Sequence, residues 1–340
     1  MVMKETSYYS KLEDKKVQCL LCPHHCIIAE GKSGICLTRI NNNGILVSAN
    51  YCRPVSTAID PIEKKPLFHF YPGSVIFSTG PNGCNFKCSF CQNYEISQMV
   101  LDTREVSVRD IVTMVEDSGS IGIAYTYSEP YIWFETIMET GAKIRELGLK
   151  NVMVTNGYME PEPLNELLKI ADAMNIDIKS MNPDFYRRIC KGSLDPVLRT
   201  CEQVKKAGCH LEITNLLITE ENDSEKEMHT LTDYIAGNLG TDTPLHISRY
   251  FPRFKMEHPS TPMMELNRAW EIARDRLQYV YVGNVLTGNK EDTACPSCGA
   301  LLIRRSDYSV RMLPELGRKE IDGTTYGICA SCGHLTNIRL

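Results

Sequence analysis

The chain has 340 residues, of which 43% are hydrophobic and 23% charged, so it can form one large domain with small additions. Its net charge of −5 and its lack of a basic block argue against a nucleic-acid-binding surface or a polybasic membrane anchor. No apolar run is long enough to cross a membrane, and residues 1–16 lack the apolar stretch of a signal peptide. We therefore expect a cytoplasmic protein that binds neither nucleic acid nor membranes.

The cysteines carry most of the information in this sequence. Their number, 15, is high for the length, and most of them fall in three clusters along the chain. Within each cluster the cysteines are only a few residues apart, which is typical of metal ligands. In a chain without an export signal, this pattern indicates metal binding in a reducing compartment rather than a framework of disulfides.

Residues 1–65 are expected to form a cysteine-rich N-terminal extension. The extension contributes the four thiols of Cys19, Cys22, Cys26 and Cys36. Their spacing, C-x2-C-x3-C-x9-C, suits either a zinc site or an iron–sulfur site. His24 and His25 lie within this segment and could replace one thiol. We predict a second metal site here, and the spacing leaves the choice between zinc and an iron–sulfur cluster open.

Residues 66–287 alternate between short apolar strands and helix-like segments. The expected strands are 74–79, 122–127, 151–156, 174–179, 210–218, 245–250 and 279–285. The expected helices are 108–118, 131–147, 162–173, 184–190, 196–207, 224–239 and 263–277. The repeated order of apolar strand and helix predicts an α/β fold with a parallel sheet that is covered by helices. Six such units are fewer than the eight of a closed barrel, so we expect a partial, open (β/α)6 barrel of the TIM type.

Residues 288–340 break this alternation and are expected to form a small separate module. They contain two matched C-x2-C-G turns, which end in Gly299 and Gly333. The cysteines of these turns are Cys295, Cys298, Cys329 and Cys332. Two paired C-x2-C turns are typical of a zinc ribbon or a rubredoxin-like module. We predict a bound ion, and we favour zinc over iron.

The segment 83–91 holds three further cysteines, Cys84, Cys88 and Cys91, at the spacing C-x3-C-x2-C. A structural zinc site or a cluster ligated only by protein normally needs four ligands. Three thiolates on a four-iron cluster leave one iron open to a small molecule. This arrangement suits the binding of S-adenosylmethionine (SAM) through its amino and carboxylate groups and its cleavage by electron transfer. The alternative is three cysteines that are buried or bind zinc and that share this spacing by chance.

Polar side chains follow successive predicted strands at the end where a parallel barrel binds its ligands. They are Glu129, Asn156, Asp177, Lys179 and Asn215. Glu129 could accept a hydrogen bond from the ammonium or the ribose of SAM, and Asn156 and Lys179 could donate to its carboxylate. Structural alternatives exist for these residues. Glu129 could cap the following helix, and Asp177 and Lys179, on one face of a strand, could pair only with each other.

The sequence resembles radical SAM proteins of the pyruvate formate-lyase activating enzyme type. The resemblance rests first on DPIEKKPLFHFYPGS (60–74) and GCNFKCSFCQNYEISQ (83–98). Further matches are TYSEP (126–130), VTNGY (154–158), DIK (177–179), ITNLLITEEND (213–223), HISRYFP (246–252) and YVGNV (281–285). The resemblance covers nearly the whole chain. It is strongest to the branch called the AmmeMemoRadiSam system radical SAM protein.

The resemblance implies a role for each matching residue. Cys84, Cys88 and Cys91 would ligate a [4Fe–4S] cluster. The backbone around Phe90 would touch the adenine of SAM. The remaining SAM contacts implied by the resemblance are Glu129 near the ammonium, Asn156, Asp177 and Lys179 around the carboxylate and a cation, and Asn215 and Asn284 beside the nucleoside. The chain departs from the activating enzymes at 127–130, where it has Tyr-Ser-Glu-Pro in place of a motif of the Gly-Gly-Glu type.

The expected activity is that of a radical SAM oxidoreductase. It would cleave SAM reductively and use the 5′-deoxyadenosyl radical to take a hydrogen atom from a substrate, while the protein orients the substrate and excludes water. A reduced ferredoxin or flavodoxin is the electron donor that the analogy implies. One alternative is an activase that makes a glycyl radical on a partner protein, although the added metal modules favour a different task. A second alternative is a non-enzymatic iron–sulfur or zinc protein for electron transfer or for bridging other proteins.

Overall fold

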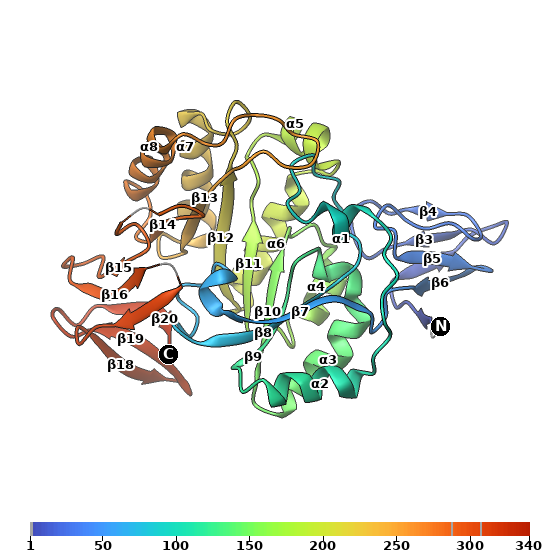
Figure 1. Cartoon of the computed structure of the whole chain (residues 1–340), viewed down its shortest axis with the longest axis horizontal. Helices are drawn as coiled ribbons and strands as arrows, with labels where there is room; N and C mark the ends of the chain where they lie inside the picture. Colours follow the sequence, from blue (N-terminus) through green and yellow to red (C-terminus); the bar gives the residue numbers. More distant parts are fainter. Residues whose placement is uncertain (1–2, 287, 307) are drawn as a thin grey trace.

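The centre of the molecule is an eight-stranded sheet with the order β14-β13-β12-β11-β10-β9-β8-β7 (Figure 1). The computed structural model describes residues 3–286, 288–306 and 308–340. The strands are β7 (Pro54–Pro61), β8 (Val75–Pro81), β9 (Gly122–Tyr125), β10 (Lys150–Thr155), β11 (Ala173–Asp177), β12 (His210–Leu217), β13 (Leu245–Arg249) and β14 (Val280–Gly283). From β8 to β14 each strand runs parallel to its neighbour, whereas β7 pairs antiparallel with β8. The outer strands, β7 and β14, do not pair with each other in the described residues, so the sheet is open.

Helices connect the parallel strands and cover the sheet. They are α1 (Tyr94–Gln98), α2 (Val108–Asp117), α3 (Phe134–Glu146), α4 (Pro161–Leu167), α5 (Pro183–Phe185), α6 (Asp195–Lys206), α7 (Glu225–Tyr234) and α8 (Met263–Arg274). Shorter helical turns are η1 (Ile62–Lys64), η2 (Pro130–Trp133), η3 (Tyr186–Cys190) and η4 (Ile235–Leu239). The strands are buried because both faces are covered; Ile123, Ile176 and Ile213, for example, have no exposed surface. The expected partial (β/α)6 barrel is confirmed.

Local sequence explains where two of these helices begin. Ser107 accepts a hydrogen bond from the Asp110 backbone and Asp110 accepts one in return, which forms a capping box at α2. Ser224 caps α7 in the same way, by accepting from the backbone N–H of Glu227. The buried side of α2 carries Ile111 and Val115, whose spacing fits one face of a helix. These signals define where the two helices begin, and the parallel order of the strands gathers the loops that follow them at one end of the barrel.

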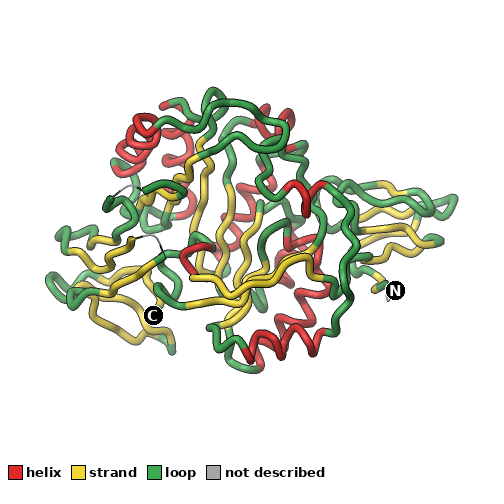
Figure 2. The backbone as a smooth tube through the Cα atoms, in the orientation of Figure 1, coloured by secondary structure: helices red, strands yellow, loops and turns green. Residues whose placement is uncertain are grey.

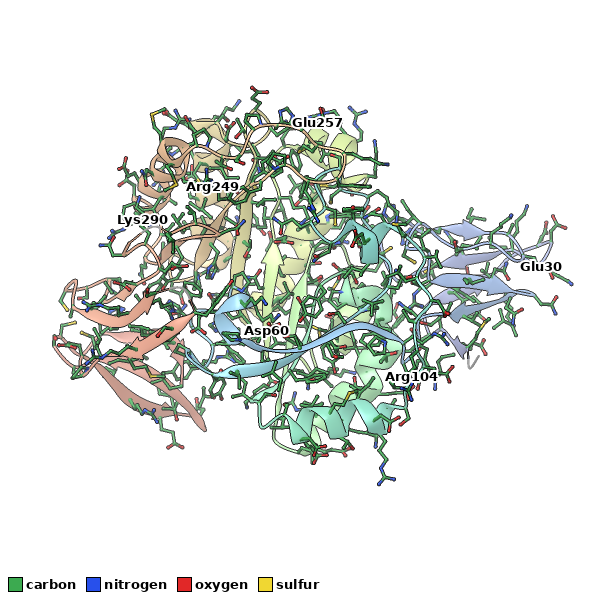
Figure 3. All side chains as sticks on the ribbon, viewed as in Figure 1. Glu30, Asp60, Arg104, Arg249, Glu257 and Lys290 are labelled. Atoms are coloured by element: carbon green, nitrogen blue, oxygen red, sulfur yellow. The ribbon has the colours of Figure 1, made fainter. Side chains whose placement is uncertain are left out.

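Two small modules made of strands lie at opposite ends of the molecule, and the helices lie between them (Figures 1 and 2). The N-terminal module contains β1 (Lys4–Glu5), β2 (Tyr9–Lys11), β3 (Val17–Cys19), β4 (Ile27–Ile28), β5 (Arg39–Asn42) and β6 (Ile45–Ser48). The C-terminal module contains β15 (Thr293–Ala294), β16 (Leu301–Ser306), β17 (Ser309–Met312), β18 (Leu316–Ile321), β19 (Thr324–Cys329) and β20 (Leu335–Arg339). Figure 3 shows Glu30 on the first module and Lys290 on the opposite side of the molecule, beside the second. β7 extends the central sheet into the range 1–65, and residue 287, where the barrel was expected to end, lies outside the described residues.

A buried polar network joins the C-terminal module to the barrel. The Glu212 carboxylate, on β12, accepts hydrogen bonds from His246 (2.6 Å) and from the backbone N–H of His69 (2.7 Å). The two ring nitrogens of His69 bond to Asn337 of the C-terminal module and, at 2.5 Å, to the Tyr281 hydroxyl of the barrel. Burial lowers the pKa of His69 to about 3, so its ring is neutral at neutral pH. In the described part of the chain, no helix has the length and the apolar character needed to span a bilayer.

Candidate functional site

The three cysteines of segment 83–91 lie directly after β8, at the carboxyl end of the barrel strands. They line a cavity of about 520 Å³ together with polar residues from the ends of β9, β10 and β11. We refer to this end of the barrel, with its cavity, as the barrel mouth. Ligands of parallel αβ barrels bind at this end because the loops after successive strands meet there. The barrel mouth therefore holds the thiols and the polar strand ends in one place.

Two contacts fix the backbone of the cysteine loop. The Asn85 side chain is fully buried, donates to the Tyr158 carbonyl (2.9 Å) and accepts from the Asn156 amide (2.8 Å). Gly83 has a φ of +97°, and a Cβ placed on it would lie 2.3 Å from the backbone oxygen of Cys36. Glycine is required at this position both for its conformation and for the close approach of the N-terminal module. The cysteine loop is thus in contact with the barrel on one side and with the N-terminal module on the other.

The three loop thiols are not arranged for a single ion. Thiolates around one tetrahedral metal lie roughly 3.8 Å apart, given a metal–sulfur distance of about 2.3 Å. Among the described residues, the sulfurs of Cys84, Cys88 and Cys91 do not all lie within 4.8 Å of one another. A cluster accepts a wider arrangement, because each thiolate binds a different iron. The three residues therefore fit a polynuclear cluster better than a mononuclear site.

The three loop thiols favour their protonated form when no metal is bound. Burial raises the pKa of the Cys84 and Cys91 thiols above the ordinary range. For Cys88, the contact with the Cys190 thiol and then burial raise the pKa well above that range. Without a positive centre these buried thiols stay protonated. Metal binding reverses this preference because thiolates are the ligands that iron binds.

Glu129 follows β9 and lies in the wall of the cavity. Its Oε1 accepts from the Tyr131 backbone N–H (3.0 Å) and the Thr155 hydroxyl (2.7 Å), and its Oε2 accepts from the Asn156 N–H (2.8 Å). It therefore caps the turn η2, as the structural alternative expected, and it also holds the end of β10. Burial raises the pKa of Glu129 to about 7. Since a carboxylate oxygen has two lone pairs, Oε2 can accept one further hydrogen bond.

Asp177 and Lys179 both line the cavity and form an ion pair of 2.9 Å. Burial alone would lower the pKa of Lys179, but the Asp177 carboxylate and the nearby Cys88 raise it well above the ordinary range. The ammonium therefore keeps its charge, and it lies 5.8 Å from the centre of the Phe90 ring. The two side chains therefore form the ion pair that the structural alternative expected. Because both also line the cavity, they can bind a charged ligand there.

Of the predicted nucleoside contacts, the structure brings Phe90 and Asn284 to the cavity but not Asn215. Asn215 is buried and donates to the Ile178 carbonyl (2.8 Å). Thr214 and Leu216, its neighbours on β12, line the cavity instead, since side chains alternate along a strand. Asn156 also lines the cavity, and its amide lies 3.8 Å from the Cys84 sulfur.

Several residues of the site were not singled out from the sequence. Thr155 orients Glu129, and Ser97 lies with its hydroxyl 3.1 Å from the Cys91 sulfur. Cys190, on η3, hydrogen-bonds to Cys88, and its backbone oxygen accepts from the Lys87 N–H (2.8 Å). Thr155 could have been found from its place at a strand end. Ser97 and Cys190 carry no local signal, because only the folded chain brings them to the loop.

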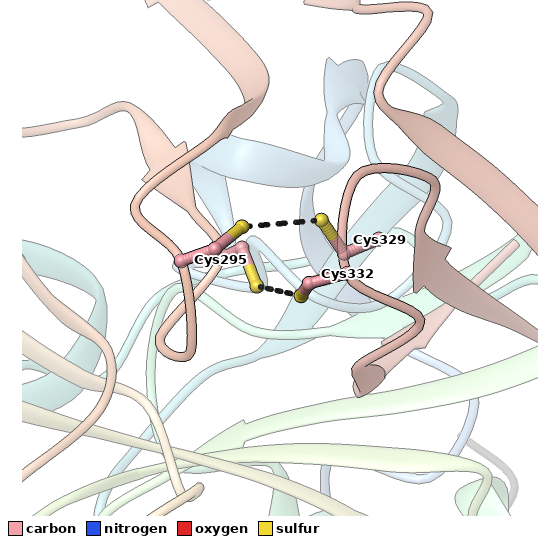
Figure 4. Close-up of side chains that lie close together, drawn as sticks. Cys295, Cys329 and Cys332 are labelled. Atoms are coloured by element: carbon pink, nitrogen blue, oxygen red, sulfur yellow. Dashed lines mark hydrogen bonds between the residues drawn. The ribbon is translucent and has the colours of Figure 1, made fainter.

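The C-terminal thiols, which are those of Cys295, Cys298, Cys329 and Cys332, have the geometry of a mononuclear metal site (Figure 4). Their four sulfurs lie within 4.8 Å of one another, and the Cys295–Cys332 and Cys298–Cys329 distances are both 3.6 Å. These values match a tetrahedron of thiolates around one ion. Although desolvation raises it, backbone N–H groups of Cys332 and Ser331 lower the pKa of Cys329 to about 7. The four residues therefore fit an additional metal ion, separate from the barrel mouth.

The N-terminal thiols are those of Cys19, Cys22, Cys26 and Cys36, and all four line one small cavity. Burial raises the pKa of Cys19 to about 11 and that of Cys22 well above the ordinary range. His24 instead bonds through Nε2 to the Asn85 carbonyl oxygen (2.8 Å), and His25 pairs with Glu160 (3.1 Å). The four thiols thus lie around one cavity, and both histidines contact other residues.

Comparison with known proteins gives results that agree with this geometry. The sequence profile of the radical SAM superfamily matches residues 79–231. An uncharacterized protein of Methanocaldococcus jannaschii is 46% identical over 316 residues, which cover 92% of this chain and 94% of that protein. The pyruvate formate-lyase 1-activating enzyme of Escherichia coli strain K12 is 22% identical over 174 residues, which cover 48% of this chain and 69% of the enzyme.

Among solved structures, a radical SAM methyltransferase from Sphaerobacter thermophilus has a similar fold. The two share 16% sequence identity at a TM-score of 0.52, over 83% of this chain and 76% of the methyltransferase. At this identity the similarity concerns the fold alone. It agrees with the open, parallel barrel described above.

Proposed function

Because the chain belongs to the radical SAM superfamily and is distantly similar to pyruvate formate-lyase activating enzyme, we propose that it cleaves SAM reductively at a [4Fe–4S] cluster held by Cys84, Cys88 and Cys91. One observation carries this proposal. Three thiols, too few to complete a cluster, share one cavity with a charged lysine, two carboxylates and an amide; Cys88 is buried, and Cys84 and Cys91 are partly exposed. When bound, the cluster supplies the electron that splits SAM into methionine and a 5′-deoxyadenosyl radical.

The polar strand ends would position SAM in this cavity. The Lys179 ammonium and the Asn156 amide can donate to the carboxylate of SAM, and charge-assisted hydrogen bonds of this kind are among the stronger ones. Asp177 keeps Lys179 charged and in place. The free acceptor site on Glu129 can receive the ammonium or a ribose hydroxyl of SAM. These contacts would hold the sulfonium end of SAM against the cysteine loop.

The apolar part of the cavity would protect the radical. Phe86, Phe90 and Leu216 line it beside the thiols, so that a bound substrate would meet the radical away from water. Thr214 and Asn284 offer polar contacts at the side next to β12 and β14. The chain itself needs no general acid or base for the first step, because a hydrogen atom moves directly from the substrate to the radical.

The proposal is tested by product analysis under anaerobic conditions. Protein reconstituted with iron and sulfide, SAM and dithionite should yield 5′-deoxyadenosine and methionine. Cys88→Ala should reduce 5′-deoxyadenosine to background, whereas Cys209→Ala, which replaces a buried cysteine outside all three clusters, should leave it unchanged. A wild-type protein that contains its cluster and forms no 5′-deoxyadenosine would show that the proposal is wrong.

Within the superfamily, we place the chain in the AmmeMemoRadiSam branch because the resemblance extends over both cysteine-rich modules. We also propose a reduced ferredoxin or flavodoxin as the electron donor, since the reaction consumes single low-potential electrons. The hydrogen donor would be a small molecule or a macromolecule that enters the open side of the cavity. Anaerobic incubation with candidate substrates should show which of them increases the rate of 5′-deoxyadenosine formation.

A second candidate function is the activation of a glycyl radical enzyme, with a protein as the substrate. It is supported by the similarity to the pyruvate formate-lyase 1-activating enzyme, which extends over 174 residues. This function would require a partner chain whose loop reaches the barrel mouth. A doublet EPR signal of a glycyl radical, formed only when SAM and a candidate partner are both present, would favour it. A substrate-derived radical on a small molecule would exclude it.

A further inference from the structure

The N-terminal thiols surround a small cavity that is otherwise lined largely by apolar side chains. Leu21, Ile28 and Ile132 contribute to its walls. Three of the four cysteines are buried, and Cys26 is partly exposed. Thr38 donates a hydrogen bond to the Cys36 sulfur (3.6 Å). An apolar enclosure with four converging thiols is a metal site by its chemistry, since free thiols gain nothing from such convergence.

The spacing of these sulfurs distinguishes them from the C-terminal thiols. In the described residues, the four C-terminal sulfurs all lie within 4.8 Å of one another, whereas no three of the N-terminal sulfurs lie that close together. Both sets belong to one chain and both consist of four cysteines. The wider set suits four thiolates that bind four different irons, and the tighter set suits one shared ion. This comparison favours a cluster over zinc at the N-terminal site.

A buried arginine lies against the same cavity. Arg39 is 1% exposed, lines the cavity and forms two hydrogen bonds to Glu135, of 3.2 and 2.8 Å. Its Nε has no hydrogen-bond partner among the described residues. Arg39 lines this cavity together with Cys19 and Cys36. An unpaired, buried N–H group indicates an absent acceptor. Sulfides of an iron–sulfur cluster and metal-bound thiolates are both acceptors, so the Arg39 Nε–H fits a bound metal centre, and the spacing of the sulfurs decides the kind of centre.

The N-terminal cavity lies directly behind the cysteine loop of the barrel mouth. The backbone oxygen of Cys36 would be 2.3 Å from a Cβ on Gly83, the residue before Cys84. The Cα atoms of Cys36 and Cys84 are therefore no more than about 10 Å apart, given standard backbone dimensions. The two groups of thiols are thus near neighbours.

We propose that the N-terminal thiols ligate a second iron–sulfur cluster, which passes single electrons to the cluster at the barrel mouth. The electron acceptor in this proposal rests on the proposed function above. In each transfer one electron leaves the reduced N-terminal cluster and reduces the oxidised cluster held by Cys84, Cys88 and Cys91. No bond forms or breaks, and no proton moves. An external low-potential, one-electron donor then reduces the N-terminal cluster again.

The existence of the second cluster is tested in a variant that lacks the first. The full-length chain carrying Cys84→Ala, Cys88→Ala and Cys91→Ala is reconstituted anaerobically with ferrous iron and sulfide. It should retain about four acid-labile sulfides per chain and, after dithionite, the EPR signal of a reduced cluster. Sulfide is the decisive count, because a mononuclear iron at the C-terminal thiols brings none. A variant without acid-labile sulfide, whether it binds zinc at the N-terminal thiols or no metal, would overturn the proposal.

Matched variants assign this signal to the N-terminal thiols. In the same triple background, Cys26→Ser should abolish the sulfide and the EPR signal, and Cys209→Ser should preserve both. Cys26 is chosen because it is the partly exposed member of the set, so its replacement disturbs packing least. Sulfide that persists in the Cys26→Ser variant at the level of the triple variant would contradict ligation by this residue set.

The electron path is tested by the interaction between the two clusters. In the fully reduced wild-type chain, two neighbouring paramagnetic clusters should broaden each other's EPR lines and relax faster than the single cluster of the triple variant. A wild-type spectrum that equals the sum of two isolated signals would place the clusters too far apart for the proposed transfer. Because the triple variant lacks the SAM site, a failure of the second cluster is distinguishable from a failure of the proposed SAM chemistry.

Discussion

The barrel mouth and the C-terminal module both contain clustered cysteines, yet the two sites differ in number, spacing and surroundings. The C-terminal thiols number four, lie within 4.8 Å of one another, and two of them, Cys298 and Cys332, are exposed. The mouth has three thiols that are spread around a cavity and accompanied by charged side chains. The first set is complete by itself. The second set has one thiol fewer and opens into a cavity that can hold a ligand.

This difference shows what separates a structural metal site from a reactive one. In the C-terminal module, the tight C-x2-C turns place all the ligands before the metal arrives, and the metal adds stability. At the mouth, the sequence supplies fewer ligands than the metal requires and surrounds the gap with Asp177, Lys179 and Glu129. In the proposed function, an open coordination position and the charged strand ends would serve the same ligand.

Removing one C-terminal thiol should have the largest effect on stability and none on the chemistry. We expect Cys298→Ser to lose one metal ion per chain together with much of the roughly 10 kcal/mol that such a site can contribute to folding. Elemental analysis and thermal unfolding measure the two losses. The rate of 5′-deoxyadenosine formation per cluster should remain near that of wild type below the unfolding temperature. Unchanged metal content, or loss of that activity in the folded protein, would contradict the assignment.

Gly83→Ala tests how strongly the mouth depends on its neighbours. The added Cβ would lie 2.3 Å from the Cys36 oxygen at a φ of +97°, so we expect a loss of roughly 3 kcal/mol in the free energy of unfolding. Gly148→Ala is the matched control, with a φ of +74° and no atom within 4 Å of the new Cβ. It should cost only about 1 kcal/mol. If Gly83→Ala and Gly148→Ala lower the free energy of unfolding equally in urea, the close contact between Gly83 and Cys36 is contradicted.

Lys179→Ala tests whether the charged strand ends serve a ligand. Loss of a charge-assisted hydrogen bond should weaken SAM binding about ten- to a hundredfold. Equilibrium binding of SAM to the anaerobically reconstituted protein measures this change. Lys169→Ala removes an exposed ion pair with Glu166 and should leave the affinity unchanged. An unaltered affinity in Lys179→Ala would mean that the lysine serves only Asp177.

The contact between the barrel and the C-terminal module, which His69 bridges, should weaken in acid. Burial lowers the pKa of His69 to about 3, below the ordinary value of about 6.5 that it has in the unfolded chain. Between these values the unfolded chain binds one more proton, so the free energy of unfolding falls as the pH falls. The contribution of His69 to the change from pH 7 to pH 5 is about 2 kcal/mol.

His69→Gln should remove this part of the pH dependence, and His229→Gln, at an exposed position, should leave it intact. Urea unfolding at pH 7 and pH 5 measures the difference between the two variants. If both variants lose stability in acid to the same extent as wild type, the His69 ring does not carry the effect.

The parallel strands could be predicted from the sequence, but the edge strand could not. β9 to β13 are largely buried, and each contains several apolar residues and alternates with a helix-like segment, so composition and order together reveal them. β7 begins with Pro54 and ends with Pro61, and it alternates between partly exposed and exposed residues over most of its length. Prolines are tolerated there because the strand lies at the edge of the sheet. Nothing in its local sequence distinguishes it from a loop.

The candidate site divides in the same way. The cysteine loop and the Asp177–Lys179 pair are local patterns, and the barrel geometry brings them together as expected. On β12, Thr214 and Leu216 line the cavity and Asn215, between them, does not, because a difference of one residue along a strand turns a side chain to the other face. The contacts of Cys190 with Cys88 depend on tertiary packing, so no spacing in the sequence could have indicated them.

The most direct test of the account is whether SAM binds to the metal at the mouth. The reduced, cluster-containing protein is mixed with SAM labelled with ¹⁵N in the amino group or ¹⁷O in the carboxylate and studied by electron–nuclear double resonance. We predict hyperfine coupling of both labels to the cluster, which disappears in Cys88→Ala. A protein whose reduced cluster is present, and whose spectrum shows no coupling to either label, would contradict an open coordination position at Cys84, Cys88 and Cys91.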